Sequence, residues 1–368
     1  MRIALVAEHL DPALGGLEQW TWQFAHALRA AGHEAEIVAF GAASCVAEAG
    51  FRVHIVELGK SFAASADALG RAAGAGGFDV VHDMGVGNFG TLFHPHGGCG
   101  LAAREMNRLR IPAWRRMTLW KERRYREQDE MERRRMDSGM PVVCVSKMVR
   151  RHFQENYGTS GDRLPVIYNG VDLARWSPTR CAVERARWRE RLGIGKKFLL
   201  LMVAHNLRLK NAETAIDVAH QLPEARLVIA GSRKPERAML HAKKRGVDVK
   251  FLGPVEDTLP LYAAADACIH PTWYDPCSLV TLEALACGLP LITTTSNGVS
   301  ELMQHGREGF VFENPQDVRG MVGSVRTMIE PAQHAGMRVA ARTCAEAHSL
   351  EAQTAAFLAL YGRLLNKP

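Results

Sequence analysis

The sequence contains no apolar run of membrane-spanning length and no C-x-x-C motif. A spanning helix needs about 18 or more nearly uninterrupted apolar residues, so none is expected here. The eight cysteines are scattered through the chain, which favours reduced, packed thiols over a disulfide framework or a cysteine-bound metal. They stand at positions 45, 99, 144, 181, 268, 277, 287 and 344. We therefore expect a cytoplasmic protein.

The N-terminal residues MRIALVAEHL form a short apolar segment without a small-residue cleavage site. This pattern predicts a β-strand over 3–7 and not a signal peptide. The length of 368 residues suggests two domains, each large enough for its own core. The hydrophobic content of 47% and charged content of 23% are typical of a globular enzyme. There is no tandem repeat.

Short apolar runs alternate with helical patterns in both halves of the chain, which predicts parallel βαβ units. Further strands are expected at 36–40, 53–57, 78–82, 91–94, 141–145, 164–168, 198–204, 225–230, 247–252, 267–270, 291–294 and 309–312. The pattern lapses into a charged, Arg-rich helix and turn at 173–197, which we interpret as a linker between domains at 1–172 and 198–349. Ligands of such α/β sheets bind at the carboxyl ends of the strands.

The stretch 274–290, YDPCSLVTLEALACGLP, carries the strongest chemical signal. A helix should begin near Ser278, whose hydroxyl can cap the first turn, and end at Gly288. Glu283 lies among apolar residues, where a carboxylate must be paired or bound because burying it alone is costly. Asp275 precedes the helix N-terminus, whose free N–H groups suit a phosphate. Two acids arranged in this way suggest a bound sugar nucleotide.

This stretch resembles the signature of retaining GT-B glycosyltransferases of family 4, E-P-F-G-L-x-x-x-E-A-x-A-x-G-x-P. Asp275 replaces the first Glu, Cys277-Ser278 replace Phe-Gly, and the rest matches in order. The resemblance implies two Rossmann-like domains facing across a cleft, with a C-terminal helix in 350–368 that crosses back to the first domain. Residues 1–172 would bind the acceptor and 198–349 the nucleotide sugar.

The resemblance also implies roles for these residues. Asp275 would bind hydroxyls of the donor sugar, and Glu283 would hold the ribose. The backbone from Cys277 through Ser278 to Leu279 would contact the sugar and the phosphate. Asp275 is one methylene shorter than the family's glutamate, so the reach of its carboxylate differs from the family pattern.

Arg208 and Lys210 follow the predicted strand 198–204 in the segment VAHNLRLKN. They match two family cations that clamp the diphosphate, with Asn211 in place of the glycine that usually follows the lysine. Two cations would stabilise the negative charge that grows on a leaving diphosphate. A solvated surface role is the alternative for both.

Gly15-Gly16 lies between the first strand and the first helix, where glycine lets the backbone approach a phosphate closely. A plain tight turn is the alternative, but the pair matches the family's glycine pair. His96, in the segment TLFHPHGG, fits a family strand end that finishes in His-Gly, with His94 as the competitor. It would hydrogen-bond the donor sugar or stabilise developing charge; a satisfied loop histidine is the alternative.

The histidines at 82, 94 and 96 could suggest a zinc site, but no fourth ligand stands at a recognisable spacing. The sequence also has no D-x-D motif, which agrees with a family that binds its donor without a metal. We therefore expect neither a metal nor another cofactor beyond the nucleotide-sugar donor.

The segment 104–135 contains twelve Lys or Arg and six acidic residues, so it supplies most of the net charge of +7. It allows three interpretations: a salt-bridged helical surface, a nucleic-acid patch, or a membrane-surface site. No nucleic-acid-binding motif surrounds it. Apolar residues that include Trp114 and Trp120 interleave with the charges, which favours a membrane or anionic acceptor at the inner face of the membrane.

The sequence thus predicts a retaining, metal-independent glycosyltransferase that moves a sugar from UDP or GDP to a cell-surface glycan or glycolipid such as lipopolysaccharide core. Its predicted catalytic residues are His96, Lys210, Asp275 and Glu283. A protein nucleophile is not required if the departing phosphate accepts the acceptor's proton, as the family's reaction is usually drawn. The alternatives are a GT-B hydrolase or epimerase of sugar nucleotides, and a non-catalytic nucleotide-sugar-binding protein.

Overall fold

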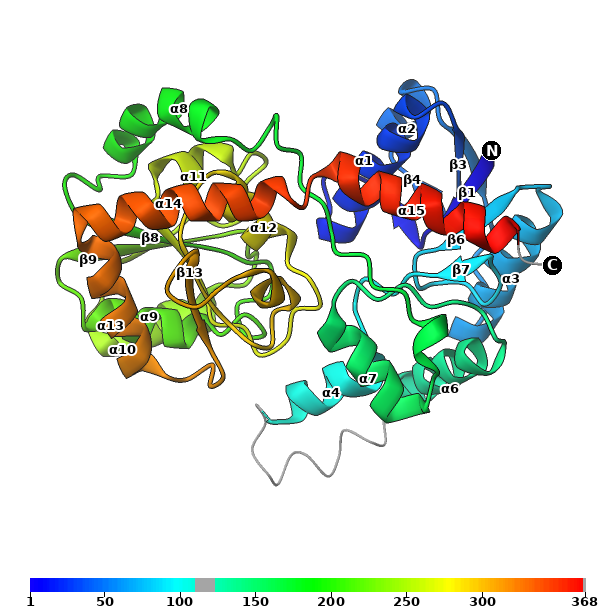
Figure 1. The fold of residues 1–368 in the computed structure, drawn as a ribbon. Helices are drawn as coiled ribbons and strands as arrows, with labels where there is room; N and C mark the ends of the chain where they lie inside the picture. The colour runs from blue at the N-terminus through cyan, green and yellow to red at the C-terminus, as the bar shows by residue number, and fades with distance from the viewer. Residues whose placement is uncertain (110–122, 367–368) are drawn as a thin grey trace. The chain divides into compact units, whose positions relative to one another are not determined.

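The structure, a computed structural model, describes residues 1–109 and 123–366 (Figure 1). The chain divides into two compact units. Unit 1 comprises Met1–Tyr168 and Leu350–Pro368, and unit 2 comprises Asn169–Ser349. No helix within the described residues has both the length and the apolar character that crossing a membrane requires.

Unit 1 is built on a five-stranded parallel sheet in the order β5-β3-β1-β6-β7. Its strands are β1 (Arg2–Val6), β3 (Glu34–Ala39), β5 (Arg52–Ile55), β6 (Val80–Asp83) and β7 (Leu92–Phe93), and a small second sheet pairs β2 (His9–Leu10) with β4 (Gly41–Ala42). The central strand β1 is almost wholly apolar and buried, as expected for a parallel strand covered on both faces. The chain leaves β1 for β3 on one side and returns to β6 on the other.

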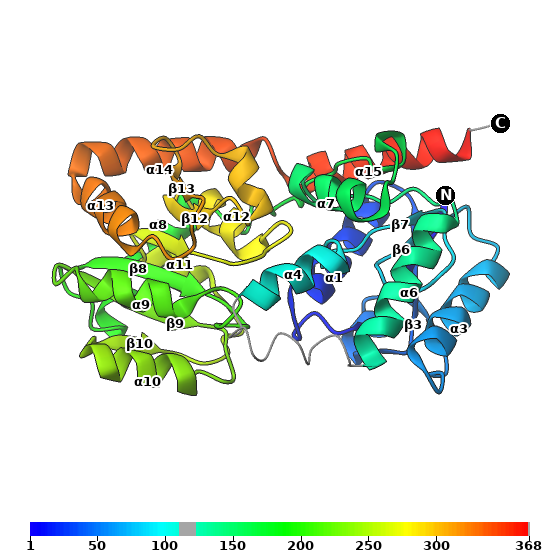
Figure 2. The same ribbon diagram turned by 90° about the horizontal axis from the view of Figure 1, so that it is seen from below.

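The helices of unit 1 cover its sheet and extend from it (Figure 2). They are α1 (Gly16–Ala30), α2 (Ser44–Glu48), α3 (Phe62–Ala75), α4 (Gly100–Leu109), α6 (Arg123–Asp137), α7 (Lys147–Tyr157), the 3-10 turn η1 (Gly161–Arg163) and α15 (Leu350–Leu365). Helix α1 buries Trp20, Phe24 and Leu28 at helical spacing. The C-terminal helix α15 packs against α1 and therefore belongs to unit 1 (Figure 1).

Unit 2 contains a six-stranded parallel sheet in the order β10-β9-β8-β11-β12-β13. Its strands are β8 (Phe198–Val203), β9 (Ala225–Ala230), β10 (Val249–Phe251), β11 (Ala267–His270), β12 (Leu291–Thr294) and β13 (Gly309–Phe312). The strand order reverses between β8 and β11. At such a switch point the loops leaving two adjacent strands diverge to opposite sides, which opens a natural ligand site at the carboxyl edge.

Helices cover both faces of the unit 2 sheet (Figure 1). They are α8 (Pro178–Arg191), α9 (Ala212–His220), α10 (Glu236–Arg245), α11 (Leu259–Ala264), α12 (Leu279–Ala286), η2 (Gly298–Leu302), α13 (Val318–Ile329) and α14 (Pro331–Glu346). Helices α9, α10 and α13 enclose a core with the apolar side chains of β8 and β9. Helices α8 and α11 pack together, as do α12 and α14.

Two predicted features differ in the structure. The segments 141–145 and 164–168 form only isolated bridges, such as Cys144 with Val166, and not strands. Pro165 has no N–H to donate, so a continuous ladder cannot form there. The segment 173–197, interpreted as a linker, lies within unit 2, and the helix predicted in it is α8, which packs on α11.

Candidate donor-binding site

The loops after β8 and β11 are tied together at the switch point of unit 2. The backbone N–H of Trp273 donates to the Leu209 carbonyl over 3.0 Å. The Thr272 hydroxyl oxygen lies 3.3 Å from the same carbonyl and 3.1 Å from the Tyr274 carbonyl, and its one proton can be donated to either. These bonds join Lys210 on one loop to Asp275 on the other: Lys210 Nζ lies 2.6 Å from Asp275 Oδ2.

The Asp275 carboxylate is buried and doubly held. Lys210 and His270 both contact its Oδ2 atom, the latter through Nε2 at 2.9 Å. Burial alone would raise the pKa of Asp275, but the positive charge of Lys210 and the hydrogen bond from His270 outweigh it and hold that pKa below its usual range. Asp275 is therefore ionised at neutral pH and acts as an acceptor of hydrogen bonds.

Sequence reasoning missed His270. It is the last residue of β11, is almost fully buried, and lies five residues before Asp275. A histidine at the carboxyl end of an apolar strand, close ahead of an acidic loop, was the available signal. Burial lowers the pKa of His270, although Asp275 opposes that shift, so the ring is neutral near pH 7.

The backbone at Asn211 explains why this position favours glycine or asparagine. Its φ of 59° is left-handed, where other side chains are strained, and its amide Nδ2 donates to the Pro315 carbonyl over 2.7 Å. The residue precedes α9 directly and so sets the course of the chain after Lys210.

Asn211→Ala should lower the free energy of unfolding by about 2 kcal/mol, because it adds left-handed strain of about 1 kcal/mol and removes a buried hydrogen bond. Asn211→Gly removes only the bond and should cost about half as much. Urea denaturation of both variants measures this difference, and an equal loss in the two would contradict a strained backbone at 211.

Glu283 lies on α12, about one turn into the helix. The Tyr262 hydroxyl, from α11, donates to Glu283 Oε2 over 2.9 Å. Burial raises the pKa of Glu283 to about 7, against the opposing effects of the Tyr262 hydrogen bond and the charge of Arg175. The buried Glu is thus poised between its neutral and ionised forms near neutral pH. Tyr262, like His270, was not identified from the sequence.

The N-terminus of α12 differs from the prediction in one respect. Ser278 occupies the N-cap position, but its side chain makes no capping hydrogen bond. Asn297 supports this turn instead: its Oδ1 accepts from the Ser278 N–H at 3.4 Å, and it is fully buried. The Asn169 amide donates to the Cys277 carbonyl over 2.7 Å. The half-buried Leu279 then begins the helix, whose first-turn N–H groups have no partner within the helix itself.

Arg208 is exposed, unlike Lys210. In the described part of the chain, its guanidinium forms no ion pair. The structure therefore brings Lys210, Asp275 and His270 into one cluster and leaves Arg208 outside it, on the same loop.

In unit 1, Gly15 and Gly16 are exposed at the start of α1. Gly15 is extended, with φ at −174°, and no side chain caps the helix. The carboxylate of Glu18 lies beside this N-terminus, where a Cβ on residue 15 would come within 2.9 Å of it. An anion bound here would therefore meet a negative charge unless Glu18 turned away.

His96 belongs to a cluster of aromatic rings in unit 1. Its ring centroid lies 4.3 Å from that of Trp20 and 4.0 Å from that of His94, and burial lowers its pKa to about 3. The competitor His94 is fully buried, and its Nδ1 hydrogen-bonds to His82 Nε2 over 2.9 Å. The other His82 nitrogen contacts the Tyr361 hydroxyl of α15 at 2.6 Å. Hydrogen bonds thus engage both ring nitrogens of His82 and one ring nitrogen of His94.

The charged segment 104–135 is described only in part. Within α4 and α6, Arg104 pairs with Asp129, and Arg135 donates to the Gly87 carbonyl over 2.7 Å. The buried Glu132 carboxylate accepts from the Tyr157 hydroxyl over 2.5 Å. Several of these charges therefore stabilise unit 1 internally. Trp114 and Trp120, which favoured a membrane contact, lie outside the described residues.

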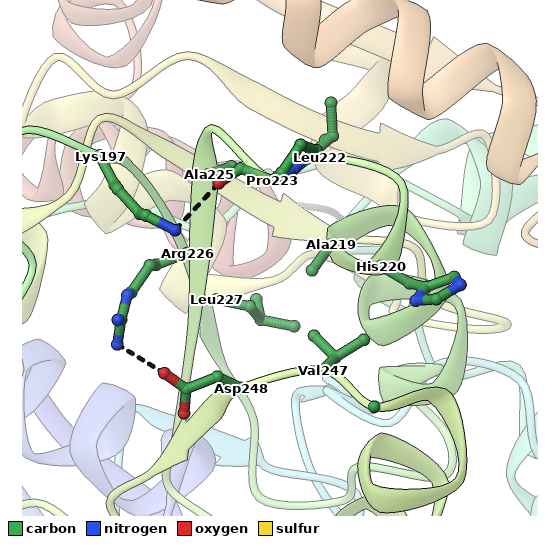
Figure 3. Close-up of a pocket in the computed structure, with 11 residues that line it drawn as sticks. Lys197, Ala219, His220, Leu222, Pro223, Ala225, Arg226, Leu227, Val247 and Asp248 are labelled. Atoms are coloured by element: carbon green, nitrogen blue, oxygen red, sulfur yellow. Dashed lines mark hydrogen bonds and ion pairs between the residues drawn. The ribbon is translucent and has the colours of Figure 1, made fainter.

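A cavity of about 240 Å³ lies elsewhere in unit 2 (Figure 3). It is lined by residues such as Lys197, Leu227 and Val247, at the amino ends of β8, β9 and β10. Its cations are engaged: Lys197 donates to the Pro223 carbonyl over 2.9 Å, and Arg226 pairs with Asp248 at 2.6 Å. The predicted donor residues lie at the opposite, carboxyl edge of the sheet.

Comparisons with known proteins agree with this architecture. Residues 14–175 match the family model described as Glycosyltransferase Family 4, and residues 197–330 match Glycosyl transferases group 1. The chain belongs to glycosyltransferase family 4. Its fold is GT-B: a crystal structure of WaaG, a glycosyltransferase involved in lipopolysaccharide biosynthesis, matches 98% of this chain and 99% of its own with a TM-score of 0.82 at 21% identity.

Two curated relatives of this family 4 member are informative. The lipopolysaccharide glucosyltransferase WaaG of Escherichia coli is 29% identical over 52% of this chain and 54% of its own length. A GDP-mannose-dependent phosphatidylinositol dimannoside mannosyltransferase of Mycobacterium tuberculosis is 30% identical over 61% of this chain and 58% of its own length. The chain therefore spans about half the length of the curated relatives it matches.

Proposed function

We propose that this family 4 protein is a retaining glycosyltransferase that uses a nucleotide-diphosphate sugar. The observation that carries the proposal is the Lys210–Asp275 ion pair at 2.6 Å, placed at the switch point of unit 2 beside the N-terminus of α12. A cation, a helix N-terminus and an ionised carboxylate suit a diphosphate followed by a sugar.

The donor would be held by three parts of this site. Lys210, with Arg208 from the same loop, would contact the diphosphate together with the first-turn N–H groups of α12. Lys210 and His270 both contact the Oδ2 atom of Asp275. The other carboxylate oxygen, Oδ1, would accept hydrogen bonds from hydroxyls of the sugar. Glu283 would accept from the ribose hydroxyls, which favours its ionised form over the neutral one.

The reaction would rely on positioning and charge stabilisation. As the bond from the anomeric carbon to the diphosphate breaks, the acceptor hydroxyl attacks the same face and its proton passes to the departing phosphate oxygen. No residue forms a covalent bond in this scheme, and no metal is needed. His96 of unit 1 would hydrogen-bond the sugar; its lowered pKa keeps it neutral, so it would act as a hydrogen-bonding group and not as a cation.

The acceptor would be a cell-surface glycan or glycolipid, such as lipopolysaccharide core. The names of the two curated relatives, one acting on lipopolysaccharide and one on a phosphatidylinositol mannoside, support this class. The basic segment 104–135 would meet an anionic acceptor or the inner membrane surface, with the enzyme in the cytoplasm. The base of the donor would be uridine or guanosine.

A hydrolase or epimerase acting on sugar nucleotides would use the same donor site. Incubating the protein with UDP-glucose or GDP-mannose alone separates this alternative. Release of free sugar, or a changed sugar, at turnover rates without an acceptor would favour it over a transferase.

The proposal predicts that a thermal-shift panel of nucleoside diphosphates and their sugars will identify one stabilising base. A ligand that binds only the folded state raises Tm with its concentration over Kd, and the shift should vanish in Glu283→Ala. Glu236→Ala, which removes an exposed acid on α10, is the matched control and should keep the wild-type response. A flat response of the wild type to every nucleotide would contradict the proposed function and favour a protein without this donor site.

A further inference from the structure

In the proposed function the Lys210 ammonium contacts both the Asp275 carboxylate and the diphosphate of the donor. It has three N–H donors, of which two are used: one meets Asp275 Oδ2 at 2.6 Å and one the Tyr274 carbonyl at 3.2 Å. If Lys210 engages a diphosphate, its position shifts toward the phosphate oxygens and its hold on Asp275 weakens. Asp275 then depends on a donor other than Lys210, because burying a carboxylate without a partner costs free energy.

His270 supplies this donor through Nε2, and its position is fixed by the surrounding structure. Its backbone lies within β11, which pairs with β12 through the register His270 with Thr293. The Thr293 hydroxyl and the Thr272 N–H both donate to the His270 carbonyl, over 3.0 and 2.8 Å. The side chain is 1% exposed, so its position is set by the strand and by packing.

The hydrogen bond to Asp275 also fixes the state of the ring. An ionised carboxylate only accepts, so His270 Nε2 must carry the proton and donate it. Among the residues that the structure describes, its other nitrogen, Nδ1, is buried and has no hydrogen-bond partner. The ring therefore keeps its proton on Nε2, where it donates to Asp275, even though this tautomer leaves the Nδ1 lone pair without an acceptor role among the described residues.

We propose that His270 is a positioning residue that holds the Asp275 carboxylate for the donor sugar while Lys210 serves the diphosphate. The inference rests on the proposed function and deepens it. It assigns the sugar contact to Asp275 held by His270, and the diphosphate contact to Lys210. His270 does not touch the donor; it acts through Asp275.

The test compares the Kd of a nucleoside diphosphate with that of its sugar nucleotide, using UDP with UDP-glucose and GDP with GDP-mannose. His270→Asn carries an amide too short to reach Asp275, whereas the amide nitrogen of His270→Gln lies near the place of Nε2. We expect the ratio of Kd for sugar nucleotide to Kd for diphosphate to rise about tenfold in His270→Asn and His270→Leu. It should stay near the wild-type value in His270→Gln.

A merely structural role would lower Tm and weaken the diphosphate and the sugar nucleotide equally, leaving the ratio unchanged. An unchanged ratio in folded His270→Asn or His270→Leu would overturn the inference and leave the proposed function standing. If neither folds, a raised ratio in folded His270→Gln would overturn it, and a wild-type ratio there would support it. Failure of the wild type to bind any of the four nucleotides would overturn the proposed function and this inference with it.

Discussion

Lys210→Ala should lower kcat for sugar transfer by about 10²- to 10³-fold, the effect of removing one group that stabilises charge in the transition state. Lys210 is the cation that the fold brings into the donor cluster, through the bonds that tie the β8 loop to the β11 loop. Negative charge grows on the diphosphate as the sugar leaves. Removing the ammonium therefore raises the barrier more than it weakens binding of the ground state.

The measurement is release of nucleoside diphosphate in the presence of the acceptor, with donor affinity determined in parallel. Lys243→Ala removes an exposed lysine on α10 and is the matched control. Since Lys210 also neutralises Asp275, the double variant Lys210→Ala/Asp275→Asn distinguishes loss of the clamp from an uncompensated buried charge. Near-wild-type turnover in Lys210→Ala would rule out the clamp.

Much of this architecture could be predicted from the sequence because parallel strands buried on both faces are nearly continuous apolar runs. The strands β8, β9, β11 and β12 stand out in this way. The predicted segment after β11 also placed Asp275 and Glu283 correctly with respect to α12. Local patterns of this kind depend on residues close together in the chain.

The departures depend on partners distant in the chain. Ser278 looked like a capping residue, but Asn297 takes over the support of that turn from nineteen positions away. The arginines of 173–197 were assigned to a linker, yet Arg185 and Arg189 both pair with Asp266, and Arg185 also donates to the Ala265 carbonyl over 2.7 Å. Charge alone does not reveal whether an arginine has a buried acceptor.

The same argument applies to the missed site residues. His270 and Tyr262 sit in apolar segments, where a histidine or tyrosine is usually part of the core. Their meaning comes only from the carboxylates they face, at 2.9 Å in each case. A contact between side chains of different elements is not encoded in the spacing of either element.

Acid should destabilise unit 1 from about pH 6.5 downward, because three neutral histidines are packed together there. Burial places the pKa of His82 and His94 well below the usual value and that of His96 at about 3. In the unfolded chain these groups titrate near 6.5, so below about pH 6.5 the unfolded state binds more protons, and for His96 this holds down to about pH 3. The contribution of these histidines to the free energy of unfolding is therefore fully present above pH 6.5. It decreases as the pH is lowered below 6.5, by about 1.4 kcal/mol per pH unit for each histidine.

Asp275 also lowers the free energy of unfolding as the pH falls, but only at lower pH. Because its pKa is lowered in the folded protein, its contribution is lost only below its unfolded pKa near 3.8. The window from pH 6 to 5 thus isolates the histidines from that carboxylate. Glu283 has the opposite sign: its raised pKa means that its contribution is fully present below its unfolded value of about 4.5 and declines as the pH rises through 7. Only a comparison of variants assigns the slope to one group.

His96→Phe makes that comparison, because it keeps an aromatic ring against Trp20 and removes the titrating nitrogens. Urea unfolding at pH 7, 6 and 5 should show a slope that is smaller than that of the wild type by about 1.4 kcal/mol per pH unit between pH 6 and 5, and by less between pH 7 and 6. His9→Gln, at an exposed site, should keep the wild-type slope. Equal slopes in His96→Phe and the wild type would mean that His96 takes up no proton on unfolding, and that its ring is already solvated in the folded protein. In that case His96 would also be free to act as a cation toward the donor, contrary to the neutral role proposed for it.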